Sequence, residues 1–138
     1  MKLVLDNNPL FSIMNPKSIA AYLFASIKCG FIAPEFIKLE MAEHKEECLI
    51  KSRLSEHEFE IRQKEVEDSI DFFKPSAYEG FLDRASELTS DPDDIDFLAL
   101  ALSAKASIWS NDPHLRQQSS VGVFTTEDLT KLFLRGRL

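Results

Sequence analysis

An almost entirely apolar stretch in the last third of the chain limits what this sequence can fold into. Residues 97–104 read Phe-Leu-Ala-Leu-Ala-Leu-Ser-Ala, and an acidic segment that opens with Asp91-Pro92 precedes them. Aspartate followed by proline predicts a helix start, because aspartate caps free backbone N–H groups and proline suits the first helical position. A helix that is hydrophobic all round must be covered by other elements. We therefore expect this helix to be buried in a layered core.

Short hydrophobic segments alternate with helical patterns along the rest of the chain. We expect strands over residues 2–5, 31–33, 69–73, 107–109 and 121–124, and helices over residues 16–29, 34–51, 55–68, 75–88, 91–104 and from 126 onward. The helix over 55–68 opens with Ser55 and Glu58, which fit the S-x-x-E capping box. Residues 6–9, Asp-Asn-Asn-Pro, predict a loop after the first strand. This alternation is typical of a three-layer α/β/α fold with a mostly parallel central sheet.

Length and composition indicate one domain over residues 1–138. The chain has 138 residues, 44% of them hydrophobic, which is enough for one well-buried core. Its two cysteines, Cys29 and Cys48, form no CxxC pair and no zinc-ligand pattern, as expected for thiols in a reducing cytosol. The longest apolar run, residues 19–25, is shorter than the ~20 residues of a membrane helix. We therefore expect a cytoplasmic protein with no membrane partner.

The net charge of −7 argues against a simple positively charged sleeve for nucleic acid. Binding of a phosphate backbone would need cations. The acidic residues themselves can supply such cations by binding metal ions.

Four acidic residues stand where a parallel sheet would bring them together. Asp6 and Asp112 each follow a predicted strand, and the carboxyl ends of parallel neighbours meet at the same edge of the sheet. Glu40, from the helix after Pro34, and Asp94, from the first turn of the apolar helix, can join them. Four converging carboxylates repel one another unless cations neutralise them. Oxygen ligands favour Mg²⁺ or Mn²⁺ over zinc, and the expected chemistry is phosphoryl transfer by metal-activated water.

The same segments resemble those of the PIN domain family, and the resemblance covers nearly the whole chain. Leu3-Val-Leu-Asp6-Asn-Asn8 is similar to the family's first strand with its aspartate, and residues 33–40 resemble the segment that supplies its glutamate. The most telling likeness is residues 91–101 followed by residues 108–112, with an acid at a helix start and another after the next strand.

The resemblance implies a metal-dependent endoribonuclease, commonly the toxin member of a VapBC-type toxin–antitoxin pair. Its acidic set would be Asp6, Glu40, Asp94 and Asp112, which would serve both as catalytic residues and as ligands for Mg²⁺ or Mn²⁺. Supporting residues would be Asn8 and Ser110, the latter orienting Asp112 or a water, and Asp96, which with Asp93 could replace Asp94 as the ligand. The implied partners are an RNA substrate and an antitoxin protein. The apolar residues of the last predicted helix, with Phe72 and Phe73, would suit contact with an antitoxin or with a second copy of the chain.

Plainer interpretations stay open beside this one. Asp91 and Asp93 suit helix capping, Asp6 and Asp112 suit tight turns, and Glu40 lies on a helix rich in solvated acids. If these roles are the only ones, the chain is a catalytically silent PIN-like module that binds RNA or a protein.

Other residues with chemical potential have ordinary explanations. His114, two residues beyond Asp112, could touch a substrate, whereas Trp109 is expected in the core. Arg135 and Arg137 could contact phosphate, although a frayed tail is the default expectation for them. An aspartate-based phosphatase is disfavoured because position 8 is Asn, and a phospho-receiver is disfavoured because no lysine follows the late strand.

Overall fold

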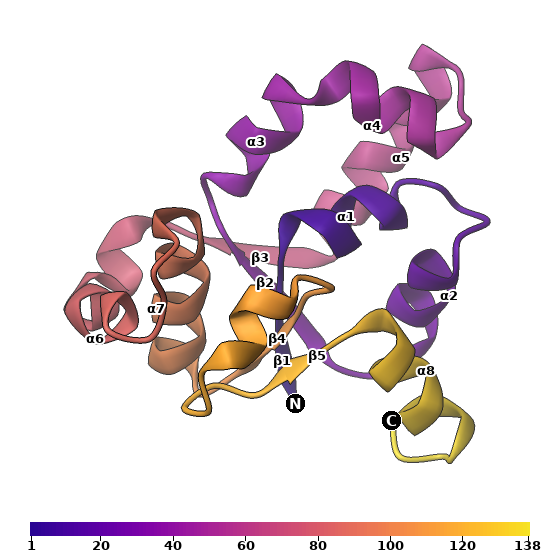
Figure 1. Ribbon diagram of the computed structural model, residues 1–138. Helices are drawn as coiled ribbons and strands as arrows, with labels where there is room; N and C mark the ends of the chain where they lie inside the picture. Colours follow the sequence, from indigo (N-terminus) through magenta and orange to yellow (C-terminus); the bar gives the residue numbers. More distant parts are fainter.

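Five parallel strands form the middle layer of the computed structural model, which describes all residues from Met1 to Leu138. The strands are β1 (Lys2–Leu5), β2 (Gly30–Pro34), β3 (Ile70–Phe73), β4 (Ser107–Trp109) and β5 (Val123–Phe124). Their order across the sheet is β3-β2-β1-β4-β5, and every neighbouring pair is parallel. The predicted three-layer α/β/α architecture is confirmed (Figure 1).

Helices cover the sheet on both sides. They are α1 (Asn7–Ile13), α2 (Ile19–Ser26), α3 (Ile37–Glu43), α4 (Lys45–Ser52), α5 (Glu56–Asp68), α6 (Leu82–Ser86), α7 (Ile95–Ala104) and α8 (Thr126–Leu134). Helix α7 packs on β1, β2 and β4, and α6 packs on α7. On the other side of the sheet α1 and α2 pack together, and α8 contacts α2 (Figure 1). None of these helices has the length and hydrophobicity that crossing a membrane requires.

The apolar helix is buried as expected. Five consecutive residues of α7, Phe97 to Ala101, are each at most 2% exposed. They share one core with the central strand β1, whose Leu3, Val4 and Leu5 are fully buried, and with Trp109 at the end of β4. A strand that is buried on both faces reads as a continuous hydrophobic run, as β1 and β4 do.

The predicted loop over residues 6–9 is wrong, because helix α1 begins there. Asp6 is the N-cap of α1, and its Oδ1 accepts a hydrogen bond from the Asn7 N–H at 2.8 Å. Pro9 is tolerated at the third helical position, since the first N–H groups of a helix have no partner within it. The start of the next helix is also later than predicted. Its cap is Ser18, whose Oγ accepts from the Ala21 N–H at 3.0 Å, so the helix begins at Ile19 rather than at residue 16.

The helix predicted over 34–51 is divided in the structure. Helices α3 and α4 meet at His44, and the bend allows α4 to contact α1 and α5. Local pattern does not indicate the break, because the buried Met41 and Cys48 lie seven residues apart, a spacing that one continuous helix also satisfies.

Two further boundaries differ from expectation. The segment predicted as a helix over 75–88 contains two 3₁₀ turns before the short α6, because the buried Tyr78 bonds to α7 and interrupts the regular helix. The last strand is shorter than 121–124, whereas α8 starts at the predicted Thr126, after a capping box of Thr125 and Asp128. The capping box of Ser55 and Glu58 is confirmed, with both reciprocal hydrogen bonds present.

Candidate active site

The strand order places a crevice at the carboxyl ends of β1 and β4. From β1 the chain proceeds outward on one side to β2 and β3, and on the other side it returns with β4 and β5. Open parallel sheets bind ligands at such a switch point, since the loops after the two central strands diverge there. Leu5 pairs with Trp109 at the last rung, and the Asp6 N–H donates to the Trp109 carbonyl at 3.1 Å. Asp6 and Ser110 therefore emerge side by side.

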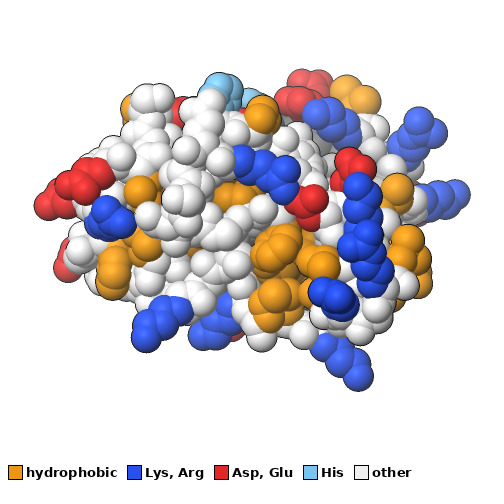
Figure 2. Space-filling view, turned by 60° about the horizontal axis from the view of Figure 1, so that its bottom comes forward, with side chains coloured by type: hydrophobic (Ala, Val, Ile, Leu, Met, Phe, Trp, Pro, Cys, Tyr) orange, Lys and Arg blue, Asp and Glu red, His pale blue; other side chains and the backbone are white.

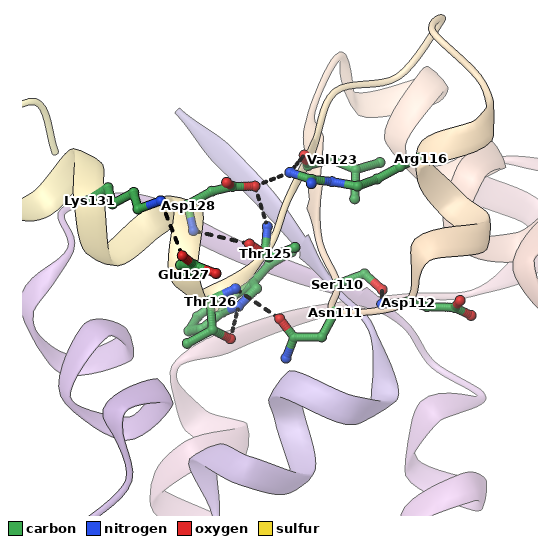
Figure 3. Close-up of polar contacts among 11 residues, drawn as sticks. Ser110, Asn111, Asp112, Arg116, Val123, Thr125, Thr126, Glu127, Asp128 and Lys131 are labelled. Carbon is green, nitrogen blue, oxygen red and sulfur yellow. Dashed lines mark hydrogen bonds and ion pairs between the residues drawn. The ribbon is translucent and has the colours of Figure 1, made fainter.

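Ser110 connects the two strand ends through its side chain. Its hydroxyl is fully buried and donates to Asp6 Oδ2 at 2.6 Å, while its Oγ accepts from the Asp112 N–H at 3.0 Å. The sequence predicted that Ser110 orients Asp112 or a water. In the structure its hydroxyl proton is donated to Asp6, and it also contacts Asp112 by accepting the Asp112 backbone N–H, as Figure 3 shows.

Asp94 enters the crevice from the turn that precedes α7. The 3₁₀ turn Pro92–Asp94 begins at Asp91, whose Oδ1 accepts from the Asp93 N–H at 3.0 Å. Asp94 is 5% exposed, and its closest side-chain partner is the Thr89 hydroxyl at 3.5 Å. The predicted capping role of Asp91 is confirmed, and the cap sets the turn that directs Asp94 inward.

These segments enclose a cleft of about 420 Å³. Its lining contains the predicted Asp6, Asn8, Asp94 and Asp112, and it also contains Asn7, Asp91, Asp93, Phe97 and Asn111. We call this space the acidic cleft. It gathers five carboxylates without a single lysine or arginine in its lining.

The carboxylates of the acidic cleft destabilise one another's charged forms. Burial chiefly, with a further contribution from Asp112, raises the pKa of Asp6 above 3.8 even though Ser110 and Asn7 donate hydrogen bonds to it. Burial together with the charges of Asp91, Asp112 and Asp6 raises the pKa of Asp94 from 3.8 to about 6. Like charges held together in this way favour capture of a cation.

Glu40 and Asp96 lie outside the acidic cleft. Glu40 lines an adjoining cleft of about 350 Å³, which shares Asn7 and Asp93 with the acidic cleft. Its carboxylate lies 3.9 Å from His44 Nε2, and one ligand atom from each of Glu40, Glu43 and His44 falls within 4.8 Å of the others. Asp96 lines the adjoining cleft too, and its Oδ2 accepts the Tyr78 hydroxyl proton at 2.7 Å. This bond connects α7 to the 3₁₀ turns that precede α6.

The residues of the acidic cleft fit a hard divalent cation. Every side-chain ligand that the cleft offers is an oxygen of a carboxylate or an amide, as Mg²⁺ and Mn²⁺ prefer. The side-chain oxygen of Asn7 is also buried without a hydrogen-bond partner. A buried acceptor without a donor is costly, and a cation would satisfy it.

Two contacts of the site were not expected from the sequence. Asn111 donates through Nδ2 to Asn8 Oδ1 at 3.2 Å. It also accepts the Thr126 N–H on Oδ1 at 2.9 Å (Figure 3), so it links the cleft to the start of α8. The only sign of this role in the sequence was the position of Asn111 between Ser110 and Asp112. His114 Nδ1 lies 2.9 Å from Asp112 Oδ1, a contact that places the ring beside the cleft.

Comparison with known proteins agrees with this geometry. No curated protein matches the chain. The family model described as the PIN domain matches residues 4–132, which is nearly the whole chain and includes every acid of the acidic cleft. The chain therefore belongs to the PIN domain family, whose members are in general nucleases and typically use divalent metals.

Proposed function

We propose that the protein is a Mg²⁺- or Mn²⁺-dependent endoribonuclease that hydrolyses phosphodiester bonds of RNA in the acidic cleft. The observation that carries the proposal is the meeting of Asp6, Asp94 and Asp112 in one cleft without a balancing cationic side chain. Family membership supports a nuclease. The choice of RNA as substrate rests on the resemblance to the PIN domain family. The choice of Mg²⁺ or Mn²⁺ rests on the cleft's ligands, which are all oxygens.

Asp6, Asp94 and Asp112 would hold the divalent ion, with Asn8 and the amide oxygen of Asn7 beside them. Once bound, a divalent ion supplies activation of water for attack on phosphorus and stabilises charge on the leaving oxygen. The cleft contains no cysteine or serine placed as a nucleophile, since the Ser110 hydroxyl is fully buried and already bonded to Asp6. Ser110 holds Asp6 in one orientation, which reduces the reorganisation needed on metal binding.

Glu40 belongs to the proposal as an outer member of the acidic set. It lines the adjoining cleft, and its side chain is 35% exposed. From there it is suited to contact water or the substrate strand. We therefore expect its removal to cost less activity than removal of Asp112.

Cleavage of single-stranded RNA by purified protein tests this function. We expect cleavage with Mg²⁺ or Mn²⁺ and none with chelator. Asp6→Asn should cleave at least about 100-fold more slowly, because loss of even an outer-shell partner of a metal ligand reduces activity by up to about that factor. Asp71→Asn, an exposed position on β3, is the matched control and should cut normally. Absence of cleavage by wild-type protein in both metals would favour the catalytically silent module. Normal cleavage by Asp6→Asn would show that the cleft is not the active site.

We further propose, from the resemblance, that the nuclease acts as the toxin of a VapBC-type pair. Induced expression should then arrest growth with the wild-type protein and not with Asp112→Asn, at matched protein levels. Equal growth of the two strains would remove the toxin role and leave the ribonuclease proposal to its own assay.

A further inference from the structure

A second hollow, of about 330 Å³, lies beside β5 and α8 and has the opposite charge to the acidic cleft. Its charged lining is Arg116, Asp128, Lys131 and Arg135, so three cations face one carboxylate. We call it the basic hollow. Figure 2 shows Lys and Arg side chains standing around an exposed hydrophobic area on this side of the molecule.

The cations of the basic hollow are only partly neutralised. Arg116 pairs with Asp128 across the hollow, and Lys131 Nζ lies 3.1 Å from Glu127 Oε1 on the same helix (Figure 3). Arg135, the C-cap residue that follows α8, forms no ion pair. In a chain of net charge −7, this excess of positive charge is a local reversal that suits an anionic ligand.

The rest of the lining is apolar. Val123 and Phe124 of β5 and Leu132 of α8 are half-buried, and they lie between the cations. Single-stranded nucleic acids combine both features, since phosphates pair with Lys and Arg while bases contact aromatic and apolar side chains. An acidic peptide would use the charges and leave this apolar surface without a counterpart.

The basic hollow and the acidic cleft are built on the same two segments. Arg116 follows Asp112 by four residues, in the 3₁₀ helix Pro113–Gln117 whose N-cap is Asp112. Asn111, which lines the acidic cleft, accepts the N–H of Thr126 at the start of α8, the helix that carries Lys131. The acidic cleft and the basic hollow are thus joined through residues 111–117 and the start of α8.

We propose that the basic hollow binds the phosphate backbone of a single RNA strand beyond the point of cleavage, with a base against Phe124 and Leu132. This inference rests on the proposed function, because the strand is the substrate of the acidic cleft. Arg116, Lys131 and Arg135 provide the phosphate contacts. The hollow raises affinity for the strand and takes no part in bond breaking.

Binding of a fluorescein-labelled oligouridine, followed by anisotropy in chelator, tests the hollow without any cleavage. The variant Lys131→Gln/Arg135→Gln removes two exposed charges from α8, and Lys64→Gln on α5 is the matched control, since Lys64 is exposed and unpaired. We expect the double variant to bind about 10-fold more weakly at low salt. Its slope of log K against log salt should be shallower by about 1.4, as each lost phosphate contact to a single strand contributes about 0.7.

Two outcomes would overturn the inference. One is equal affinity and slope for the double variant and Lys64→Gln. The other is tighter binding of labelled oligoglutamate than of oligouridine, lost in the double variant, which would make the hollow a docking site for an acidic protein. The variant Lys131→Arg/Arg135→Lys keeps the charges and should bind like wild type, so a loss caused by altered folding is recognised. A protein that binds oligouridine through the hollow and never cuts it would refute the nuclease and leave the hollow standing.

Discussion

Two aspartates of this molecule, Asp94 in the acidic cleft and Asp128 at the start of α8, have opposite electrostatic roles. In the acidic cleft, burial and like charges raise the pKa of Asp94 to about 6. At the start of α8, hydrogen bonds from Thr125 and the charges of Arg116 and Lys131 lower the pKa of Asp128 below 3.8. Asp128 stabilises the fold by being charged, whereas Asp94 in its charged form destabilises it. An acid paired with a lysine or arginine is thus structural, and acids gathered without either cation indicate a binding site.

The largest effect expected from this comparison is on catalysis. Asp112→Asn should slow RNA cleavage by at least about 100-fold, as even outer-shell partners of metal ligands contribute up to about that factor. Glu40→Gln should lose clearly less, because Glu40 lies in the adjoining cleft. Initial rates for both variants at saturating Mn²⁺ measure the difference. A greater loss of cleavage rate for Glu40→Gln than for Asp112→Asn would indicate that the active site is centred on α3 rather than on the acidic cleft.

Replacing an acid of the cleft should increase the stability of the metal-free protein, although it reduces activity. We expect Asp94→Asn to increase the free energy of unfolding in chelator at neutral pH by on the order of 1–3 kcal/mol, because it removes a buried charge that its neighbours repel. Urea denaturation measures the change, with Asp71→Asn as the control on an exposed strand position. A destabilised Asp94→Asn would mean that the carboxylates of the cleft do not strain the fold.

Replacing the capping residue Asp128 should lower the free energy of unfolding, and by less than Asp94→Asn raises it. Asp128→Ala removes the capping box of α8 and should cost about 1 kcal/mol at neutral pH. Since the folded-state pKa of Asp128 lies below its ordinary 3.8, its contribution is full above pH 4 and is lost as the pH falls through the folded-state pKa. The difference between wild type and variant should therefore shrink in acid. A gap that widens in acid would contradict the assignment.

The smallest effect concerns a surface acid on the same helix. Glu127 pairs only with Lys131, and both side chains are more than half exposed. Glu127→Ala should change stability by no more than about 0.5 kcal/mol. A loss similar to that of Asp128→Ala, measured in the same denaturation series, would show that helix charge rather than capping stabilises α8.

The sequence predicted the framework well and the helix boundaries less well. Continuous hydrophobic runs located β1 and β4, and an all-apolar pattern located α7, because complete burial leaves a strong signal. The start of α1 was missed because Asp-Asn-Asn-Pro is suited equally to a turn and to a capped helix start. The bend at His44 and the 3₁₀ turns near Tyr78 depend on contacts between distant segments, which local patterns do not contain.

Of the four acids that the sequence predicted to meet, Asp6, Asp94 and Asp112 line the acidic cleft, whereas Glu40 lines the adjoining one. Asp6 and Asp112 follow paired strands, so the register of β1 and β4 brings them together. Glu40 and Asp96 lie on helices, where a rotation of one residue changes the direction of the side chain. Asp96, two residues from Asp94, consequently bonds to Tyr78 rather than lining the acidic cleft.

The proposed function requires that Asp6, Asp94 and Asp112 together hold one or more divalent ions. A crystal structure of the wild-type protein grown with Mn²⁺, with the ion located by anomalous scattering, measures this binding. We expect Mn²⁺ in the acidic cleft, ligated by oxygens of these three carboxylates. Mn²⁺ bound instead at Glu40, Glu43 and His44, or an acidic cleft without Mn²⁺ at saturating concentration, would contradict it.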